Sequence, residues 1–168
     1  MSSFEHPAIA TVAAALAEAG QQRAADRIRI LPDEARTAAQ AAQALGVEVG
    51  AIANSLIFRA VAADGAEFPL LALTSGAHRA DLAALTSLCG AASVGKADPA
   101  FVKRHTGQVI GGVAPIGHVT RPVTLVDTEL RRHEEVWAAA GHAKSVYPTT
   151  FDDLLALTGG TAAEVAGS

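Results

Sequence analysis

The chain has 168 residues, which is about the length of one domain. Hydrophobic residues make up 50% of it, but 39 of these are alanines, and only 4% of all residues are aromatic. Charged residues make up 18%, too few for a chain that stays unfolded in water. No apolar run approaches the roughly 20 residues of a membrane span. The formal net charge of −4 is not that of a protein that coats duplex DNA.

The first residues and the cysteine content indicate the compartment. Residues 1–18 contain acids and no basic stretch, so they do not resemble a secretory signal. Cys89 is the single cysteine, which excludes an internal disulfide and a cysteine-based zinc site. The six histidines show no metal-ligand spacing, and no common hydrolase or nucleotide-binding motif is present. We therefore expect a cytoplasmic protein without metal or cofactor.

In the first half of the chain, apolar spacing predicts two helices and a hairpin. Pro7 and Gly20 bracket the first helix, in which Ile9, Val12 and Leu16 fall on one stripe. The other expected elements are a strand-like alternation over 27–31, a helix from Asp33 that Gly46 ends, and two strands, over 52–60 and 68–74, joined by a turn at Asp64-Gly65.

The second half predicts three helices separated by short strands. The expected elements are a helix over 78–88 with Leu82, Leu85 and Leu88 on one side, a helix from Asp98-Pro99 to Gly107, strands over 123–126 and 145–147, a strand-like run within 134–141, and a helix over 151–157 that Thr150 caps. No repeat or linker is visible. We expect one α+β domain over residues 1–160 around a mixed sheet, followed by a flexible C-terminal tail over 161–168.

A glycine-rich run, Gly111-Gly112-Val113-Ala114-Pro115-Ile116-Gly117-His118, is not typical of an ordinary strand. Glycine lets the backbone come close to a ligand, and successive N–H groups can converge on an anionic oxygen. The spacing fits a tight connecting loop, and it fits equally a main-chain loop that binds an oxyanion or a phosphate.

Two further segments carry similar alternatives. Thr74-Ser75-Gly76-Ala77-His78 lies at a strand-to-helix junction, where N–H groups either bind an anion or simply cap the helix. Trp137-Ala138-Ala139-Ala140-Gly141-His142 places small side chains at the end of a strand. That run predicts either a pocket for a small side chain or close packing against an alanine-rich helix.

Together these motifs resemble the YbaK/EbsC family of aminoacyl-tRNA deacylases, the prolyl-tRNA synthetase editing-domain family. The resemblance extends in family order from the second expected helix to the last one. The matching stretches are Ala44–Val47 leading into Ile52–Phe58, Leu73–Gly76 with Arg79 and Asp81, Phe101-Val102 with Thr106-Gly107, Ile110–His118, and Trp137–His142.

The resemblance implies a single-domain mixed sheet in a crossed or barrel-like arrangement, with flanking helices. It implies hydrolysis of the ester that joins a wrong amino acid to the 3′ end of a tRNA, without a metal. The expected partner is the tRNA acceptor end, with an aminoacyl-tRNA synthetase as a second candidate. No membrane or duplex DNA is expected. Because the 168 residues hold no synthetase domain, we expect free-standing trans-editing, with a small amino acid as the rejected group.

The resemblance also implies the site. Its glycine loop, here Gly111 to Pro115, supplies backbone contacts to the aminoacyl group, while a positioned water and the ribose hydroxyl of the substrate carry much of the catalysis. The candidate catalytic residues are Asn54, Gly111, Gly112, Val113, Ala114 and Pro115. The candidate substrate-binding residues are Ser55, Ser75, Gly76, His78, Gly117, His118, Ala140, Gly141 and His142.

Asn54 departs from the family pattern, which has a lysine just before the strand that begins at Ser55. A neutral amide donates a hydrogen bond but supplies no point charge, and losing a positioned charge costs about 2–4 kcal/mol of transition-state stabilisation. Three hypotheses follow: an active trans-editing deacylase, a catalytically impaired module that binds a tRNA 3′ end or an aminoacyl ligand, and a hydrolase of another small acyl ester.

Basic residues near the start and at two later points are candidates for tRNA contact. If they converge on one face, they hold an acceptor end despite the net negative charge; otherwise they are scattered solvated charges. These residues are Arg23, Arg27, Arg29, Arg36, Lys103, Arg104, Arg131 and Arg132.

Overall fold

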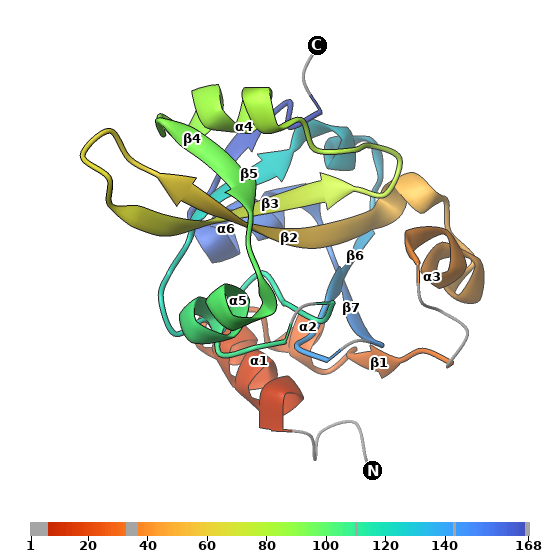
Figure 1. Cartoon of the computed structure of the whole chain (residues 1–168). Coiled ribbons are helices and arrows are strands. Elements are labelled where there is room, and N and C mark those ends of the chain that lie inside the picture. Colours follow the sequence, from red (N-terminus) through yellow and green to blue (C-terminus); the bar gives the residue numbers. More distant parts are fainter. Residues whose placement is uncertain (1–6, 33–36, 110, 143, 167–168) are drawn as a thin grey trace.

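The computed structural model describes residues 7–32, 37–109, 111–142 and 144–166. Figure 1 shows helices packed around a strongly bent sheet. In chain order the described elements are α1 (Pro7–Glu18), α2 (Gln22–Ala25), β1 (Arg29–Ile30), α3 (Ala38–Leu45), the 3-10 helix η2 (Val49–Ala51), β2 (Ile52–Val61), β3 (Glu67–Ser75), α4 (Leu82–Cys89), β4 (Ser93–Lys96), α5 (Pro99–Thr106), β5 (Val123–Asp127), the 3-10 helix η3 (Thr128–Arg132), β6 (Val136–Ala139), β7 (Ser145–Thr149), α6 (Phe151–Thr158) and β8 (Thr161–Ala163).

The strands of the described chain form one mixed sheet in the order β1-β7-β6-β2-β3-β5-β8, with β4 also paired to β2. The predicted hairpin is present as the antiparallel pair β2–β3, whereas β2–β6, β3–β5 and β5–β8 are parallel. Figure 1 shows β6 and β7 running steeply away from the direction of β2 and β3. The predicted α+β class around a mixed sheet is confirmed.

One edge of β2 is interrupted, and this interruption creates the site. β3 pairs with β2 from Ala53 to Val61. On the opposite edge, β6 pairs only with Ile52 and Ala53, and β4 pairs only from Phe58 to Val61. Between these partners, residues 54–57 have no neighbouring strand on this edge in the described part of the chain. Their outward backbone groups therefore face a loop and a cavity instead of a strand.

The core lies where the sheet meets α1 and α6. The predicted stripe of α1 is confirmed, because Ile9, Val12 and Leu16 are at most 1% exposed and pack into this core. Each such side chain stabilises the fold by roughly 1.5–3 kcal/mol relative to exposure. β3 is buried on both faces, as its apolar sequence predicts. No helix among the described residues is long and apolar enough to cross a bilayer.

Short polar side chains begin the helices, and left-handed glycines end them. The Thr37, Asp81, Asp98 and Thr150 side chains each accept a backbone N–H three residues later. The glycines Gly46, Gly90, Gly107 and Gly159 adopt positive φ at the corresponding C-caps. The predicted caps at Asp98 and Thr150 are thus confirmed.

Two element boundaries differ from expectation, and a third lies outside the described residues. The helix expected over 78–88 begins only at Leu82, because Asp81 caps it. Its stripe is also narrower than expected, since Leu82 and Leu88 are 41% and 45% exposed. The alternation over 27–31 yields a strand of two residues, with Ile30 47% exposed. The start expected at Asp33 lies outside the described residues, and α3 begins at Ala38.

The segment after residue 160 is not a flexible tail over residues 161–166. β8 pairs in parallel with β5, from Thr161 to Ala163. Val165 is fully buried beneath α4, and its carbonyl accepts the Asp81 N–H at 2.8 Å. The expected flexible tail is not found there, because residues 161–163 add a strand to the edge of the sheet and Val165 packs in the core. Composition alone gives no sign of that pairing.

Candidate active site

A cavity of about 550 Å³ opens at the interrupted edge of β2. This volume is within the usual range for small-molecule sites. Residues 52–58 of β2 form one wall, and α3, β4, β6, β7 and the glycine-rich loop form the rest. The other described lining residues are Leu31, Thr37, Ala38, Ala41, Lys96, Ala97, Val102, Gly111, Val113, Trp137, Ala139, Ser145 and Val146.

The glycine-rich loop brings two backbone amides to this cavity. The Gly112 N–H donates to the Val109 carbonyl at 3.1 Å, and the Ala114 N–H donates to Gln108 Oε1 at 2.7 Å. The amides of Gly111 and Val113 have no acceptor among the described residues, and both residues line the cavity. Two free N–H donors, on either side of Gly112, are suited to stabilise a developing oxyanion.

Gln108 holds the loop in shape with both ends of its side-chain amide. It is 3% exposed. Its Oε1 accepts the Ala114 N–H, and its Nε2 donates to the carbonyls of Ile116 and Gly117 at 3.2 and 3.3 Å. The Gln108 backbone is fixed in turn, because its N–H donates to Thr106 Oγ1 at 2.9 Å. The loop is therefore a cross-linked unit anchored to the end of α5.

Gly111 is required by its backbone conformation. Its φ is +95°, in a region that L side chains rarely adopt, whereas a Cβ atom there would meet no atom within 4 Å. Any other residue at this position would strain the turn that exposes the Gly111 and Val113 amides. The glycine at position 111 is therefore explained by the backbone conformation of the loop.

The polar side chains on the cavity wall are neutral, with one exception. Asn54 and Ser55 come from β2, and Trp137 comes from β6. Ser55 Oγ and Trp137 Nε1 are buried without a hydrogen-bond partner in the described structure. Lys96 is the only charged residue among the described lining residues. The wall so described offers hydrogen-bond donors and a cation, and it offers no carboxylate or imidazole as a general base.

Ser75, Gly76 and His78 form a separate cluster and are not among the cavity-lining residues. The Ser75 N–H donates to the carboxylate Oδ2 of Asp127 at 2.9 Å, and His78 Nδ1 lies 2.9 Å from the same oxygen. Asp127 is fully buried, and Ser75 Oγ donates to the Gly50 carbonyl at 2.8 Å. This cluster ties the ends of β3 and β5 to η2, close to one end of the site.

Pro115, Gly117 and His118 line a second cavity of about 410 Å³ between the loop, α1 and α6. His118 Nε2 lies 2.7 Å from the Ala114 carbonyl. Burial lowers the pKa of His118, and the bond to Ala114 partly opposes this shift. The neutral ring with a proton on Nε2 therefore donates to that carbonyl and braces the back of the loop. Ala114 itself is fully buried in the main core.

The small-residue run divides between core and cavity. Trp137 and Ala139 line the cavity, whereas Ala140 is fully buried in the core. Gly141 packs against α1, where a Cβ atom would lie 2.8 Å from the Ala8 carbonyl oxygen. The His142 N–H donates to Ser145 Oγ at 2.9 Å. The run therefore lines the pocket at Trp137 and Ala139 and packs closely at Ala140 and Gly141, so each predicted alternative holds for part of it.

Sequence reasoning missed Gln108 and Lys96. Gln108 lies between Gly107, which ends a helix, and the glycine-rich run. A polar residue at that junction is the sequence feature that could have indicated a role in holding the loop. Lys96 ends β4, a strand that short-range periodicity did not predict. Only the pairing of β4 with β2 brings Lys96 to the cavity.

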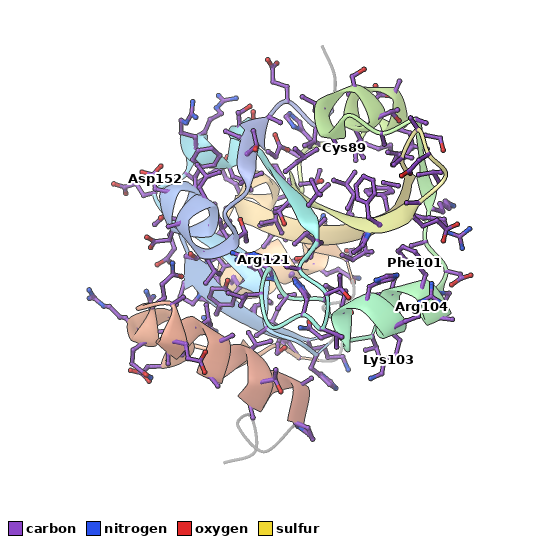
Figure 2. The ribbon with its side chains drawn as sticks, turned by 90° about the vertical axis from the view of Figure 1, so that its left-hand side faces the viewer. Cys89, Phe101, Lys103, Arg104, Arg121 and Asp152 are labelled. Atoms are coloured by element: carbon purple, nitrogen blue, oxygen red, sulfur yellow. The ribbon has the colours of Figure 1, made fainter. Side chains whose placement is uncertain are left out.

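Two of the candidate basic residues pair with acids. Arg27 pairs with Glu135 at 3.1 Å, and Arg132 pairs with Glu129 at 3.2 Å. In contrast, the Arg29 guanidinium lies 5.6 Å from the centre of the Trp137 ring, beside the cavity. Figure 2 shows Phe101 on the sheet side of α5 and Lys103 and Arg104 on its outer side. Arg36 lies outside the described residues.

A family model for the aminoacyl-tRNA editing domain matches residues 32–157. This range includes the interrupted β2, the glycine-rich loop and the cavity walls from α3 to β7. The chain belongs to the aminoacyl-tRNA editing domain family. The YbaK/EbsC resemblance drawn from the ordered motifs is therefore confirmed.

Related proteins match this editing-domain chain along most of its length. Bacillus subtilis (strain 168) YwhH, an uncharacterised protein, is 31% identical over 118 residues, which are 70% of this chain and 72% of YwhH. A crystal structure of a proposed trans-editing enzyme for prolyl tRNA synthetase is 39% identical, with a TM-score of 0.86 over 96% of this chain and 98% of that one. The hypothetical protein APE2540 is 25% identical, with a TM-score of 0.77 over 92% of this chain and 98% of that one.

Proposed function

We propose that this editing-domain protein is a free-standing deacylase that hydrolyses, in trans, the ester of a tRNA mischarged with a small amino acid. One observation carries the proposal: the free amides of Gly111 and Val113 meet Asn54 and Ser55 at one cavity. Membership of the editing family and the similarity to a proposed trans-editing enzyme support the same activity.

In this proposal the protein orients the attacking water and the ester, and the substrate and water carry out the proton transfer. Water attacks the ester carbonyl, whose oxygen gains negative charge and is stabilised by the Gly111 and Val113 amides. The attacking water gives a proton to the neighbouring ribose hydroxyl, and that hydroxyl passes its own proton to the ribose oxygen as the ester bond breaks. The products are the free amino acid and a tRNA 3′ end with both ribose hydroxyls. Asn54 and Ser55 orient the water and the ribose by hydrogen bonds. The described cavity wall has no carboxylate or imidazole, which fits this substrate-assisted route.

The cavity wall favours a small aminoacyl side chain. Ala38, Ala41 and Ala139 line it with methyl groups, and Trp137 is a large buried wall residue. A pocket of this kind discriminates weakly, because one methylene is worth only about 1–3 kcal/mol. Alanine, serine, threonine and cysteine esters are therefore expected to be hydrolysed with overlapping rates.

A panel of mischarged tRNAs tests this function. The expected result is release of free amino acid well above the buffer rate for at least one small amino acid. Competition by uncharged tRNA must slow that reaction, since a general esterase would be indifferent to it. Buffer-level release from every tRNA in the panel would reject the proposal. Docking on a synthetase is a separate hypothesis, tested by co-sedimentation.

Asn54 favours a second candidate, a binding module with impaired catalysis. The family position that holds a lysine has a neutral amide here, so the charge that would act at the ester is missing from that point of β2. Asn54→Lys separates the two candidates. A large gain in hydrolysis in Asn54→Lys over an inactive wild type supports the binding module, whereas an active wild type supports the deacylase.

A further inference from the structure

Lys96 brings a cation to the cavity from the end of β4. It is exposed, and it is the only charged side chain among the described residues that line the cavity. In the β2–β4 pairing it stands opposite Phe58, four residues beyond Asn54. At about 3.3 Å per residue, Lys96 and Asn54 are separated by roughly 13 Å along β2. They therefore mark opposite ends of the interrupted edge.

The charge of Lys96 has no counter-ion among the described residues. Asp98 is the acid nearest to it in sequence, and its carboxylate is already engaged. One Asp98 oxygen lies 3.8 Å from the Arg59 guanidinium, and the other accepts the Phe101 N–H at 2.8 Å as the cap of α5. The Lys96 ammonium is therefore available to a ligand that enters from solvent.

The opposite end of the cavity has hydrogen-bond donors without acceptors. Trp137 is 6% exposed, and its Nε1 has no partner in the described structure. An indole N–H only donates, so a cavity with this group and a free ammonium is matched by a ligand with several acceptor oxygens. Unpaired buried donors are uncommon in folded proteins and are normally satisfied by water or a ligand.

We propose that Lys96 binds the phosphate that links the terminal nucleotide of the substrate to the rest of the acceptor strand. This inference rests on the proposed function. The separation along β2 exceeds the length of a lysine side chain, so Lys96 does not replace the missing charge at Asn54. It instead fixes the nucleotide so that the ester reaches Gly111 and Val113. Lys96 is thus a positioning residue, and its charge acts on binding and not on the oxyanion.

On tRNA, this assignment separates KM from kcat. Lys96→Gln is expected to raise KM about fivefold, the upper range for one exposed ion pair, and to leave kcat within a factor of two. The slope of log affinity against log salt concentration falls by about 0.7, as expected for one lost single-strand phosphate contact. Lys144→Gln is the matched charge control, because Lys144 is not among the candidate tRNA contacts and does not line the cavity.

The decisive test uses adenosine and adenosine 5′-monophosphate as probes, with binding followed by NMR titration. The wild type and Lys144→Gln are expected to bind the monophosphate about fivefold more tightly than adenosine, and Lys96→Gln is expected to lose this preference. A preference that survives Lys96→Gln, or no preference in the wild type, overturns the assignment. Because this readout needs no hydrolysis, its failure is distinct from failure of the deacylase proposal on the tRNA panel.

Discussion

Replacing Gln108 by methionine tests whether one buried amide shapes the catalytic loop. The substitution keeps the length of the side chain and removes three hydrogen bonds, to the Ala114 N–H and to the Ile116 and Gly117 carbonyls. At about 1 kcal/mol of net stabilisation each, the free energy of unfolding falls by about 3 kcal/mol. For a domain of this size the melting temperature then falls by roughly 6–12 °C.

Urea unfolding measures the loss of stability, and a loss of catalysis should accompany it. Without Gln108 the Ala114 amide lacks its acceptor, so the Gly111 and Val113 amides lose their fixed orientation. We expect kcat to fall by about a hundredfold, which is the low end for loss of an oxyanion donor. Gln43→Met is the matched control, because Gln43 is exposed on α3. An unfolding free energy for Gln108→Met within about 0.5 kcal/mol of wild type would refute the reasoning.

Three further predictions follow from local geometry. Gly111→Ala lowers the unfolding free energy by about 1–2 kcal/mol in urea titration, because its φ is positive, whereas Gly95→Ala, with open space and no such φ, does not. Burial raises the pKa of Tyr147, the single tyrosine, so ultraviolet absorbance should show no phenolate until the chain unfolds. The unfolded state then loses a proton that the folded state keeps, so the free energy of unfolding falls as pH rises above 10, and Tyr147→Phe should remove this loss. A phenolate signal from the folded protein would contradict this. Burial lowers the pKa of His118, so its contribution to the free energy of unfolding is complete above pH 6.5. This contribution is lost as pH falls below 6.5, because the unfolded state then binds a proton that the folded state does not. His118→Gln should therefore flatten the acid side of a plot of unfolding free energy against pH.

The sequence predicts most helices and the central hairpin because their signals are local. Asp98 and Thr150 begin helices by capping backbone amides, and Asp64-Gly65 turns the chain between two apolar runs. These signals act within a few residues. β4 and β8 were missed because each has at most four residues, and their pairing with β2 and β5 joins distant segments.

The site shows the same division between local and long-range information. The glycine-rich loop is visible in sequence because a φ of +95° at Gly111 requires glycine. The gap in β2 that makes the cavity arises from where β4 and β6 stop pairing, and no motif encodes that. Ser75 and His78 looked like site residues because loops at strand ends often bind ligands, yet the buried carboxylate of Asp127 holds both.

We propose that water hydrolyses the ester of a mischarged tRNA in the cavity at the gap in β2, with the Gly111 and Val113 amides stabilising the oxyanion. The most direct test measures amino acid release from a panel of mischarged tRNAs by the wild type and by Asn54→Lys in the same assay. We expect the wild type to hydrolyse at least one small aminoacyl ester above the buffer rate. Buffer-level release by the wild type on every tRNA would contradict it, whether or not Asn54→Lys is active.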